Sequence, residues 1–213
     1  MRYEEFREKV HKLPFFRAYI LEQLQEKPEA LKVQLSHWVK KGLVIKLRQG
    51  IYTLNDSQRS CKFTNYFLAN NLYSPSYISL EYALQFYGFI PEGVFVVTSI
   101  STKKTENFDN QFGRFQYRTV KLNVYRHFIE HKDIYGNRFY IASPEKALLD
   151  FLYFATAHIK KIKSDIFEES FRLQNLENVD CNKLIKYAEA YEQKKIISTA
   201  KMLVDYITEE WQS

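Results

Sequence analysis

Apolar residues recur at helical spacing between residues 28 and 41, and the opposite side of that segment is polar or small. The apolar stripe consists of Leu31, Leu35, Trp38 and Val39. Gly42 follows, where the C-cap of a helix favours a residue that tolerates positive φ. Residues 43–45 and 50–54 then have strand composition and flank a basic tip, KLRQ. A helix with a polar face followed directly by such a hairpin is typical of a winged helix-turn-helix, so we expect that fold here.

Shorter amphipathic segments precede this element. Residues 3–13 and 15–25 each place apolar side chains on one helical face, so we expect a helix in both. Together with the helix and hairpin they would form an N-terminal domain over residues 1–56. The stretch NDSQRS that follows is polar and turn-rich, and it marks the boundary to a second domain over residues 61–213.

The second domain is expected to be mixed α+β, with a central sheet and C-terminal helices. Residues 94–100 are a continuous apolar run of the kind found in a central strand, and residues 113–120 alternate between apolar and polar. Ser79 and Ser143 stand where N-caps of helices are expected. Other helical patterns cover residues 63–73, 167–173, 182–191 and 196–211.

The charge of the chain is concentrated near its start. The formal net charge is +6, and residues 1–60 contribute +5 of it, with 12 Lys and Arg against 7 Asp and Glu. Between residues 30 and 55 there is no acidic residue. A basic segment in an otherwise balanced chain favours binding to a polyanion such as DNA. The alternative is a solvated helix that happens to lack carboxylates.

A winged helix predicts which side chains would contact double-stranded DNA. Base edges would be read by Gln34, His37 and Lys41, with Ala30 and Val33 against thymine methyl groups. The expected phosphate contacts are Lys32, Ser36, Lys40, Lys46 and Arg48, and Gln49 at the hairpin tip belongs to the same candidate set.

Other features of the chain narrow the class of protein. Cys61 and Cys181 are isolated, without the spacing of a metal site, so free thiols in a reducing compartment are expected. No signal peptide opens the sequence and no apolar stretch is long enough to span a membrane. We therefore expect a soluble cytoplasmic protein without a membrane partner.

Several segments carry a resemblance to a known family. They are VKKGL continuing to RQGIY within residues 39–52, PSYISLEYAL at 75–84, Thr98-Ser99, and IASPEKALLD at 141–150. Together they resemble the AbiEi family of antitoxins of type IV toxin–antitoxin systems, which act in abortive infection, a phage defence. The resemblance implies a winged helix that represses the protein's own operon, usually at inverted repeats. It also implies a C-terminal domain that counters a co-encoded nucleotidyltransferase-like toxin without requiring a stable complex with it.

The same motifs contain polar residues that invite a catalytic interpretation. The candidates in the second domain are Tyr77, Ser79, Glu81, Glu145, Lys146 and Asp150. Carboxylates with a lysine can hold a metal for phosphodiester cleavage. However, Glu81 and Glu145 fall in first helical turns, where negative charge is stabilised without catalysis. Lys146 and Asp150 are spaced i, i+4 and can pair on one helix.

We therefore expect a non-enzymatic DNA-binding repressor that doubles as an antitoxin and uses no cofactor or metal. The sequence contains no glycine-rich phosphate loop, GxSxG or HExxH motif. Two alternatives stay open. One is a degenerate nuclease-like enzyme, and the other is a protein-interaction module whose C-terminal helices bind a partner, with DNA binding secondary.

Overall fold

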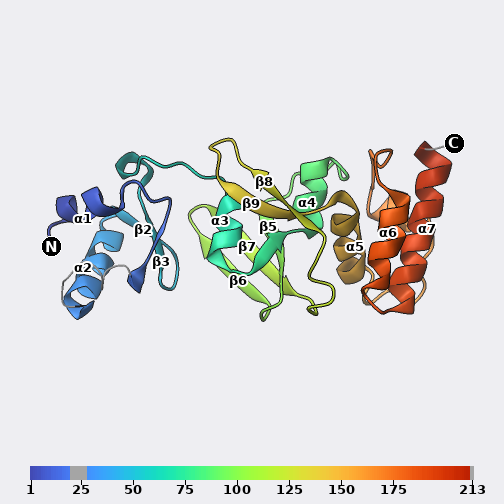
Figure 1. Ribbon diagram of the computed structural model, residues 1–213, viewed down its shortest axis with the longest axis horizontal. Coiled ribbons are helices and arrows are strands. Elements are labelled where there is room, and N and C mark those ends of the chain that lie inside the picture. The colour runs from blue at the N-terminus through green and yellow to red at the C-terminus, as the bar shows by residue number, and fades with distance from the viewer. Residues whose placement is uncertain (20–27, 212–213) are drawn as a thin grey trace.

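The computed structural model describes residues 1–19 and 28–211, and the molecule is elongated, with the N-terminal elements at one end and the last helices at the other (Figure 1). The N-terminal elements are α1 (Tyr3–Val10), β1 (Phe16–Arg17), α2 (Pro28–Lys40), β2 (Val44–Arg48) and β3 (Ile51–Leu54). The strands form an antiparallel sheet in the order β1-β3-β2.

The helix expected from the apolar stripe is confirmed as α2. Leu35 and Trp38 on that stripe are buried, and the indole of Trp38 stacks on Phe6 of α1 with 4.7 Å between ring centroids. Gly42 adopts a φ of 68° shortly after the helix ends, which is the conformation for which a glycine is favoured. The expected hairpin is β2 and β3, but the basic tip predicted at residues 46–49 is wrong: Lys46, Leu47 and Arg48 belong to β2, because Leu47 is buried in the core, and the turn is reduced to Gln49 and Gly50.

The helix predicted over residues 15–25 is wrong at its start. Phe16 and Arg17 form β1, where Phe16 pairs with Tyr52 of β3 and its buried ring packs edge-on against Phe6 at 5.2 Å. A phenylalanine fits a half-buried strand well, and pairing with the hairpin outweighs the helical spacing. Residues 20–25 of this prediction lie outside the described residues.

The rest of the chain is mixed α+β, as expected. Its strands are β4 (Ser76–Ile78), β5 (Val96–Ser101), β6 (Glu106–Asn110), β7 (Gly113–Thr119), β8 (Phe128–Lys132) and β9 (Arg138–Ala142). They form a sheet in the order β6-β7-β5-β4-β9-β8, in which β5/β7 and β4/β9 are parallel pairs. The helices are α3 (Asn65–Leu72), α4 (Leu80–Tyr87), α5 (Pro144–Ala155), α6 (Cys181–Glu189) and α7 (Lys194–Trp211).

The apolar strand and the alternating strand expected from the sequence are β5 and β7, which lie side by side in the sheet. The edge strands β6 and β8 have the polar sequences ENFDN and FIEHK, and the apolar pattern did not indicate them. Residues 167–173 were expected to be helical, and here the chain has a short π-helix over Ile166–Ser170. The last helices pack against one another beyond the sheet (Figure 1).

The hairpin contributes side chains to both hydrophobic clusters of the molecule. Val44 and Leu54 pack with α1 and α2. By contrast, Ile45, Leu47 and Ile51 belong to the large cluster formed by residues from Phe63 to Ile207. The hairpin is therefore packed between α1 and α2 on one side and the large cluster on the other.

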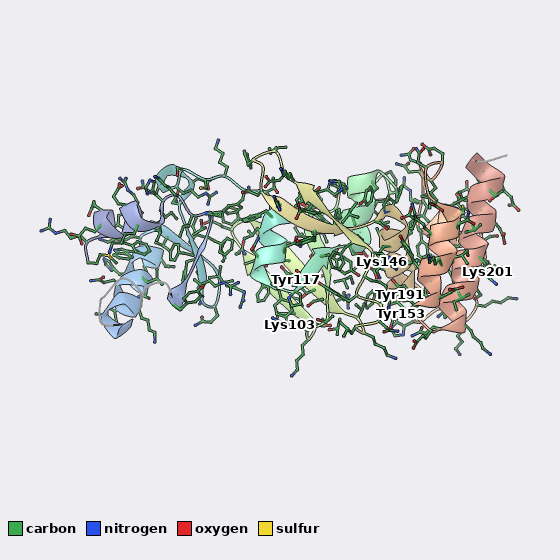
Figure 2. The ribbon with its side chains drawn as sticks, viewed as in Figure 1. Lys103, Tyr117, Lys146, Tyr153, Tyr191 and Lys201 are labelled. Carbon is green, nitrogen blue, oxygen red and sulfur yellow. The ribbon has the colours of Figure 1, made fainter. Side chains whose placement is uncertain are left out.

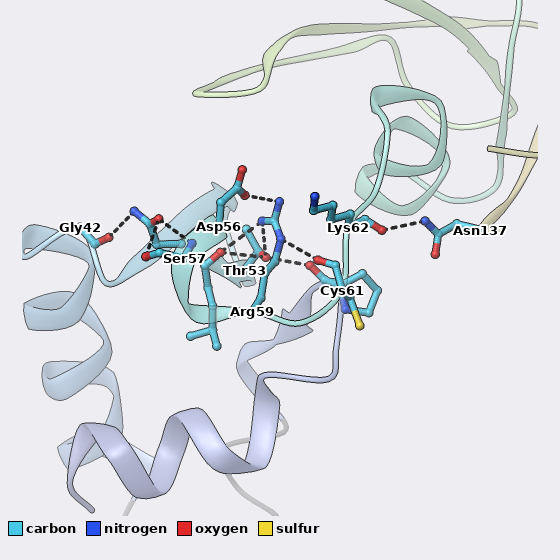
Figure 3. Close-up of polar contacts among 11 residues, drawn as sticks. Gly42, Thr53, Asp56, Ser57, Arg59, Cys61, Lys62 and Asn137 are labelled. Atoms are coloured by element: carbon cyan, nitrogen blue, oxygen red, sulfur yellow. Dashed lines mark hydrogen bonds and ion pairs between the residues drawn. The ribbon is translucent and has the colours of Figure 1, made fainter. Parts of the chain in front are cut away.

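The segment after the hairpin, with a 3-10 turn at Asp56–Gln58, is held by Arg59 (Figure 3). The Arg59 guanidinium donates to the backbone oxygens of Leu54 at 3.2 Å and Cys61 at 2.9 Å, and it forms an ion pair with Asp56. It also lies 4.3 Å from the centre of the Phe63 ring. Burial lowers the pKa of Arg59, and the Asp56 carboxylate acts in the opposite direction.

Further hydrogen bonds tie this connection to its surroundings. The Ser60 N–H donates to His11 O at 2.9 Å, and Asn137 Nδ2 donates to Lys62 O at 2.9 Å (Figure 3). The connection is therefore anchored to α1 on one side and to the β8–β9 turn on the other. None of the helices within residues 1–19 and 28–211 has both the length and the apolar character needed to cross a membrane.

Candidate nucleic-acid interface and the buried motif cluster

The outward face of α2 carries most of the candidate DNA contacts. The exposed residues there are Ala30, Lys32, Val33, Ser36, His37 and Lys40, with Lys41 directly after the helix. They are exposed because Leu35, Trp38 and Val39 on the opposite side of α2 pack on α1 and the hairpin. Val33 is 71% exposed, so its methyl groups are accessible on this face.

A groove of about 510 Å³ separates α2 from the hairpin. Lys32, Ser36 and Lys40 line it from the helix, and Lys46 and Gln49 line it from the hairpin. Its lining within the described residues includes no carboxylate. The fold thus brings cations from two elements to one groove, where their combined potential favours a polyanion.

Gln34 occupies a less open position than expected for a residue that reads bases. It is half-buried, and its Oε1 is buried without a hydrogen-bond partner among the described residues. The side-chain oxygen is therefore not presented on the exposed face of α2, in contrast to His37.

Arg48 faces the second domain and is not free at the hairpin tip. Its Nε donates to the carbonyl oxygen of Leu72 in α3, and its guanidinium lies 5.5 Å from the centre of the Phe108 ring. The pairing of β2 with β3 shifts register between Lys46 and Arg48, and such an irregularity re-aims side chains. The phosphate contact predicted for Arg48 therefore competes with an internal contact, whereas Lys46 is exposed.

The pair Lys46 and Arg48 gives a direct test of this difference. We expect Arg48→Ala to lower the free energy of unfolding by about 1–3 kcal/mol, because Leu72 O loses a charged donor. Lys46→Ala should leave stability nearly unchanged and weaken binding to any DNA duplex. Urea unfolding and fluorescence anisotropy with a labelled duplex measure the two effects. If both variants were equally stable and lost DNA binding equally, Arg48 would be a phosphate contact like Lys46, and its internal role would be contradicted.

Four of the six motif candidates, Tyr77, Ser79, Lys146 and Asp150, meet in a buried cluster around Asp150. Lys146 Nζ donates to Asp150 Oδ1 at 2.6 Å and to the Tyr191 hydroxyl at 2.7 Å, and Tyr191 in turn donates to Oδ1 at 2.6 Å. Tyr77 and Ser79 donate to Oδ2 at 3.0 and 2.8 Å. Figure 2 shows Lys146 and Tyr191 between the sheet and the last helices. The predicted i, i+4 pairing of Lys146 with Asp150 is confirmed.

Burial governs the electrostatics of this cluster. The side chains of Lys146 and Asp150 are 1% and 0% exposed. Burial lowers the pKa of Lys146, and the Asp150 carboxylate opposes that shift. Burial also raises the pKa of Tyr77 and of Tyr191, and the negative charge of Asp150 adds to it. Both phenols thus remain protonated donors, and the hydrogen bonds to Asp150 join α5 to β4 and to the α6–α7 region.

The two glutamates lie in first helical turns, as expected. Glu145 follows the N-cap Ser143, whose Oγ accepts from Lys146 N at 3.3 Å and donates to Glu145 Oε2 at 2.9 Å. This confirms the predicted cap at Ser143. Glu81 lies in the first turn of α4 and is half-buried.

Ser79 is the N-cap residue of α4, but its side chain does not cap the helix. Its hydroxyl binds Asp150, and the capping interaction comes from Thr98 of β5 instead. Thr98 Oγ1 accepts from Tyr82 N at 3.1 Å and donates to Ser79 O at 2.7 Å. The hydroxyl of Ser79 donates instead to the buried carboxylate of Asp150.

Sequence reasoning did not identify Tyr191 or Arg59 as partners in these contacts. Tyr191 lies 41 residues beyond Asp150, with no motif to join them. Arg59 belongs to a stretch that reads as an ordinary polar linker. For metal binding, the described residues contain no group of three or more His, Cys, Asp or Glu side chains placed to hold an ion.

Comparison with known proteins gives no match for this chain, either to a family model or to a curated protein.

Proposed function

We propose that the chain is a sequence-specific DNA-binding protein with an N-terminal winged helix-turn-helix, in which α2 enters the major groove and the hairpin lies along the neighbouring phosphates. The observation that carries this proposal is the groove between α2 and the hairpin, lined by Lys32, Lys40 and Lys46. Support also comes from the exposed helix face, which presents small and polar side chains beside these cations. That combination suits base edges flanked by phosphate.

The contacts divide by chemistry into those that position the protein and those that read sequence. Lys32, Lys40 and Lys46 bind phosphate and carry no sequence information. His37 and Lys41 are exposed near the end of α2 and can reach base edges, while Val33 offers a methyl surface to thymine. The half-buried Gln34 is the weakest of these readers.

His37 provides the test of this division. We expect His37→Ala to weaken binding to the duplex that precedes the protein's own coding sequence by about tenfold, a loss of about 1.4 kcal/mol of base discrimination. Binding to a scrambled duplex of equal length should change little. Anisotropy titrations on both duplexes give the ratio of the two dissociation constants for each variant. A uniform loss on both would show that His37 contacts phosphate and would contradict the proposed reading role.

We further propose that the protein represses its own operon and that its second domain acts as the antitoxin, as the resemblance to the AbiEi family implies. In support, the two motifs that carry the resemblance converge on Asp150, with Tyr77 and Ser79 from one and Lys146 from the other. Co-expression of the full chain with a neighbouring nucleotidyltransferase-like gene is the test. Restored growth supports the role, and unrelieved toxicity contradicts it.

A further inference from the structure

A cavity of about 370 Å³ lies between α3 and the strands β4, β8 and β9. Aromatic rings of Phe67, Tyr125, Phe128 and Tyr140 form much of its lining. Phe128 is at the centre of this group, 5.2 Å from Tyr125 and 5.7 Å from Tyr140 between ring centroids. Its size falls in the range of small-molecule sites, and its rings offer flat apolar surface.

Polar groups without partners lie in the same wall. Asn70 and Ser76 line the cavity and are 8% and 6% exposed. Asn70 Nδ2 and Ser76 Oγ are buried and have no hydrogen-bond partner within residues 1–19 and 28–211. An unpaired buried polar group is costly, on the order of 1–3 kcal/mol, and calls for a specific explanation.

The orientation of the Asn70 amide is fixed by its surroundings. Its Oδ1 accepts from the backbone N–H of Tyr140 at 2.5 Å. A flipped amide would place two donors against each other, so the NH₂ group is the one left without an acceptor. The cavity wall therefore contains a donor from Asn70 and a hydroxyl from Ser76 that can donate or accept.

Arg138 adds a positive charge to the lining of the cavity. Its side chain is 68% exposed, and its Nε lies 3.6 Å from the Glu130 carboxylate. This loose contact leaves most of the guanidinium open to an anion. Guanidinium groups bind phosphate oxygens with two parallel hydrogen bonds.

We propose that this cavity binds a nucleoside monophosphate, with the base among the aromatic rings and the phosphate on Arg138. Aromatic side chains stack on any nucleobase. Asn70 Nδ2 and Ser76 Oγ lie just behind the surface of the cavity, and a base edge inserted between the rings would give them the partners that they lack. The site is separate from the proposed DNA interface, so either proposal can fail alone.

The cavity wall is also connected to the buried motif cluster. The Phe128 ring stacks on Tyr77 with 4.8 Å between centroids and 18° between planes, and Tyr77 donates to Asp150. The wall residue Phe67 lies on α3, whose Leu72 carbonyl accepts the hydrogen bond from Arg48 of the hairpin. A bound nucleotide would thus contact Phe128, which packs on the Tyr77–Asp150 cluster, and helix α3, which binds Arg48 of the hairpin.

The test uses isothermal titration calorimetry of the full chain with AMP, GMP, CMP and UMP, and with adenosine and ribose 5-phosphate. We expect at least one mononucleotide to bind with a Kd on the order of 0.1 mM. Adenosine lacks the phosphate and ribose 5-phosphate lacks the base. Each should therefore bind at least about tenfold more weakly than the mononucleotide. Arg138→Gln should weaken nucleotide binding about tenfold and leave that of adenosine unchanged.

Two serines give a matched control. Ser76 and Ser99 lie on neighbouring strands, and both hydroxyls are buried without partners among the described residues, but only Ser76 lines the cavity. Ser76→Ala should weaken nucleotide binding about tenfold, and Ser99→Ala should not. Neither should lower the melting temperature, because neither removes a hydrogen bond. No binding of any mononucleotide at millimolar concentration, or equal weakening by both substitutions, would overturn the proposal.

Discussion

Asp150→Ala is expected to lower the free energy of unfolding by about 3–5 kcal/mol. The substitution leaves the Lys146 ammonium buried without its counter-ion, and it removes the acceptor of Tyr77, Ser79 and Tyr191. An uncompensated charge in a dry interior costs more than the pair itself contributes. Urea unfolding followed by circular dichroism measures the change, which is a large part of the stability of a typical domain.

The control is an ion pair of similar chemistry at the surface. Asp109 pairs with Arg114 at 3.2 Å, and both side chains are more than two-thirds exposed. Asp109→Ala should therefore change stability little, because solvent screens exposed pairs. Adding Lys146→Met to Asp150→Ala should recover part of the loss, because no buried charge then remains. Equal effects of the two aspartate substitutions would refute the structural role of the cluster.

The second large effect concerns DNA binding. Substituting Lys32, Lys40 and Lys46 together by Gln is expected to lower the affinity for duplex DNA by roughly 10²–10³-fold at about 0.1 M salt. Each lost phosphate contact also reduces the slope of log K against log salt by about 0.9, so the slope should fall by nearly 3. Anisotropy titrations over a range of salt concentrations give both quantities.

A second triple variant controls for net charge. Lys160, Lys161 and Lys163 are exposed and follow α5, and α5 is separated from α2 by the sheet (Figure 1). Changing them to Gln alters the net charge of the protein by the same amount. If this variant lost as much affinity as the first, binding would depend on overall charge, and the groove between α2 and the hairpin would not be the interface.

Both faces of the hairpin pack against the rest of the protein, and Lys46 and Gln49 are its exposed residues. The side chains of Ile45, Leu47 and Ile51 are packed in the large hydrophobic cluster, and Asn110 Nδ2 of β6 donates to Leu47 O at 3.0 Å. Arg59 and its neighbours also anchor the connection that follows. DNA bound by α2 and Lys46 would therefore meet a second domain already fixed in position.

Local patterns were sufficient for the elements that carry the proposed interface. The apolar stripe of α2 made its inner face predictable, because helical spacing alone decides which side chains share a side. The same rule gave the Lys146–Asp150 pair, and the Ser-Pro sequence gave the cap of α5. These features depend on residues fewer than five positions apart.

Contacts between distant segments were not predictable in this way. The strand β1 forms because Phe16 pairs with Tyr52 of the hairpin. Arg48 contacts α3 at the point where the pairing of β2 with β3 shifts register. Ser79 loses its expected capping role to Thr98, which is 19 residues away. Each of these outcomes is decided by a tertiary partner that no spacing rule identifies.

The most direct test of the central claim is the affinity of the full chain for the duplex that precedes its own coding sequence, compared with a scrambled duplex, as salt is raised. A specific repressor should keep a ratio of at least about 10³ between the two as both affinities fall. Equal and equally steep loss on both duplexes would reduce the α2 face to a general basic surface and contradict the proposed function.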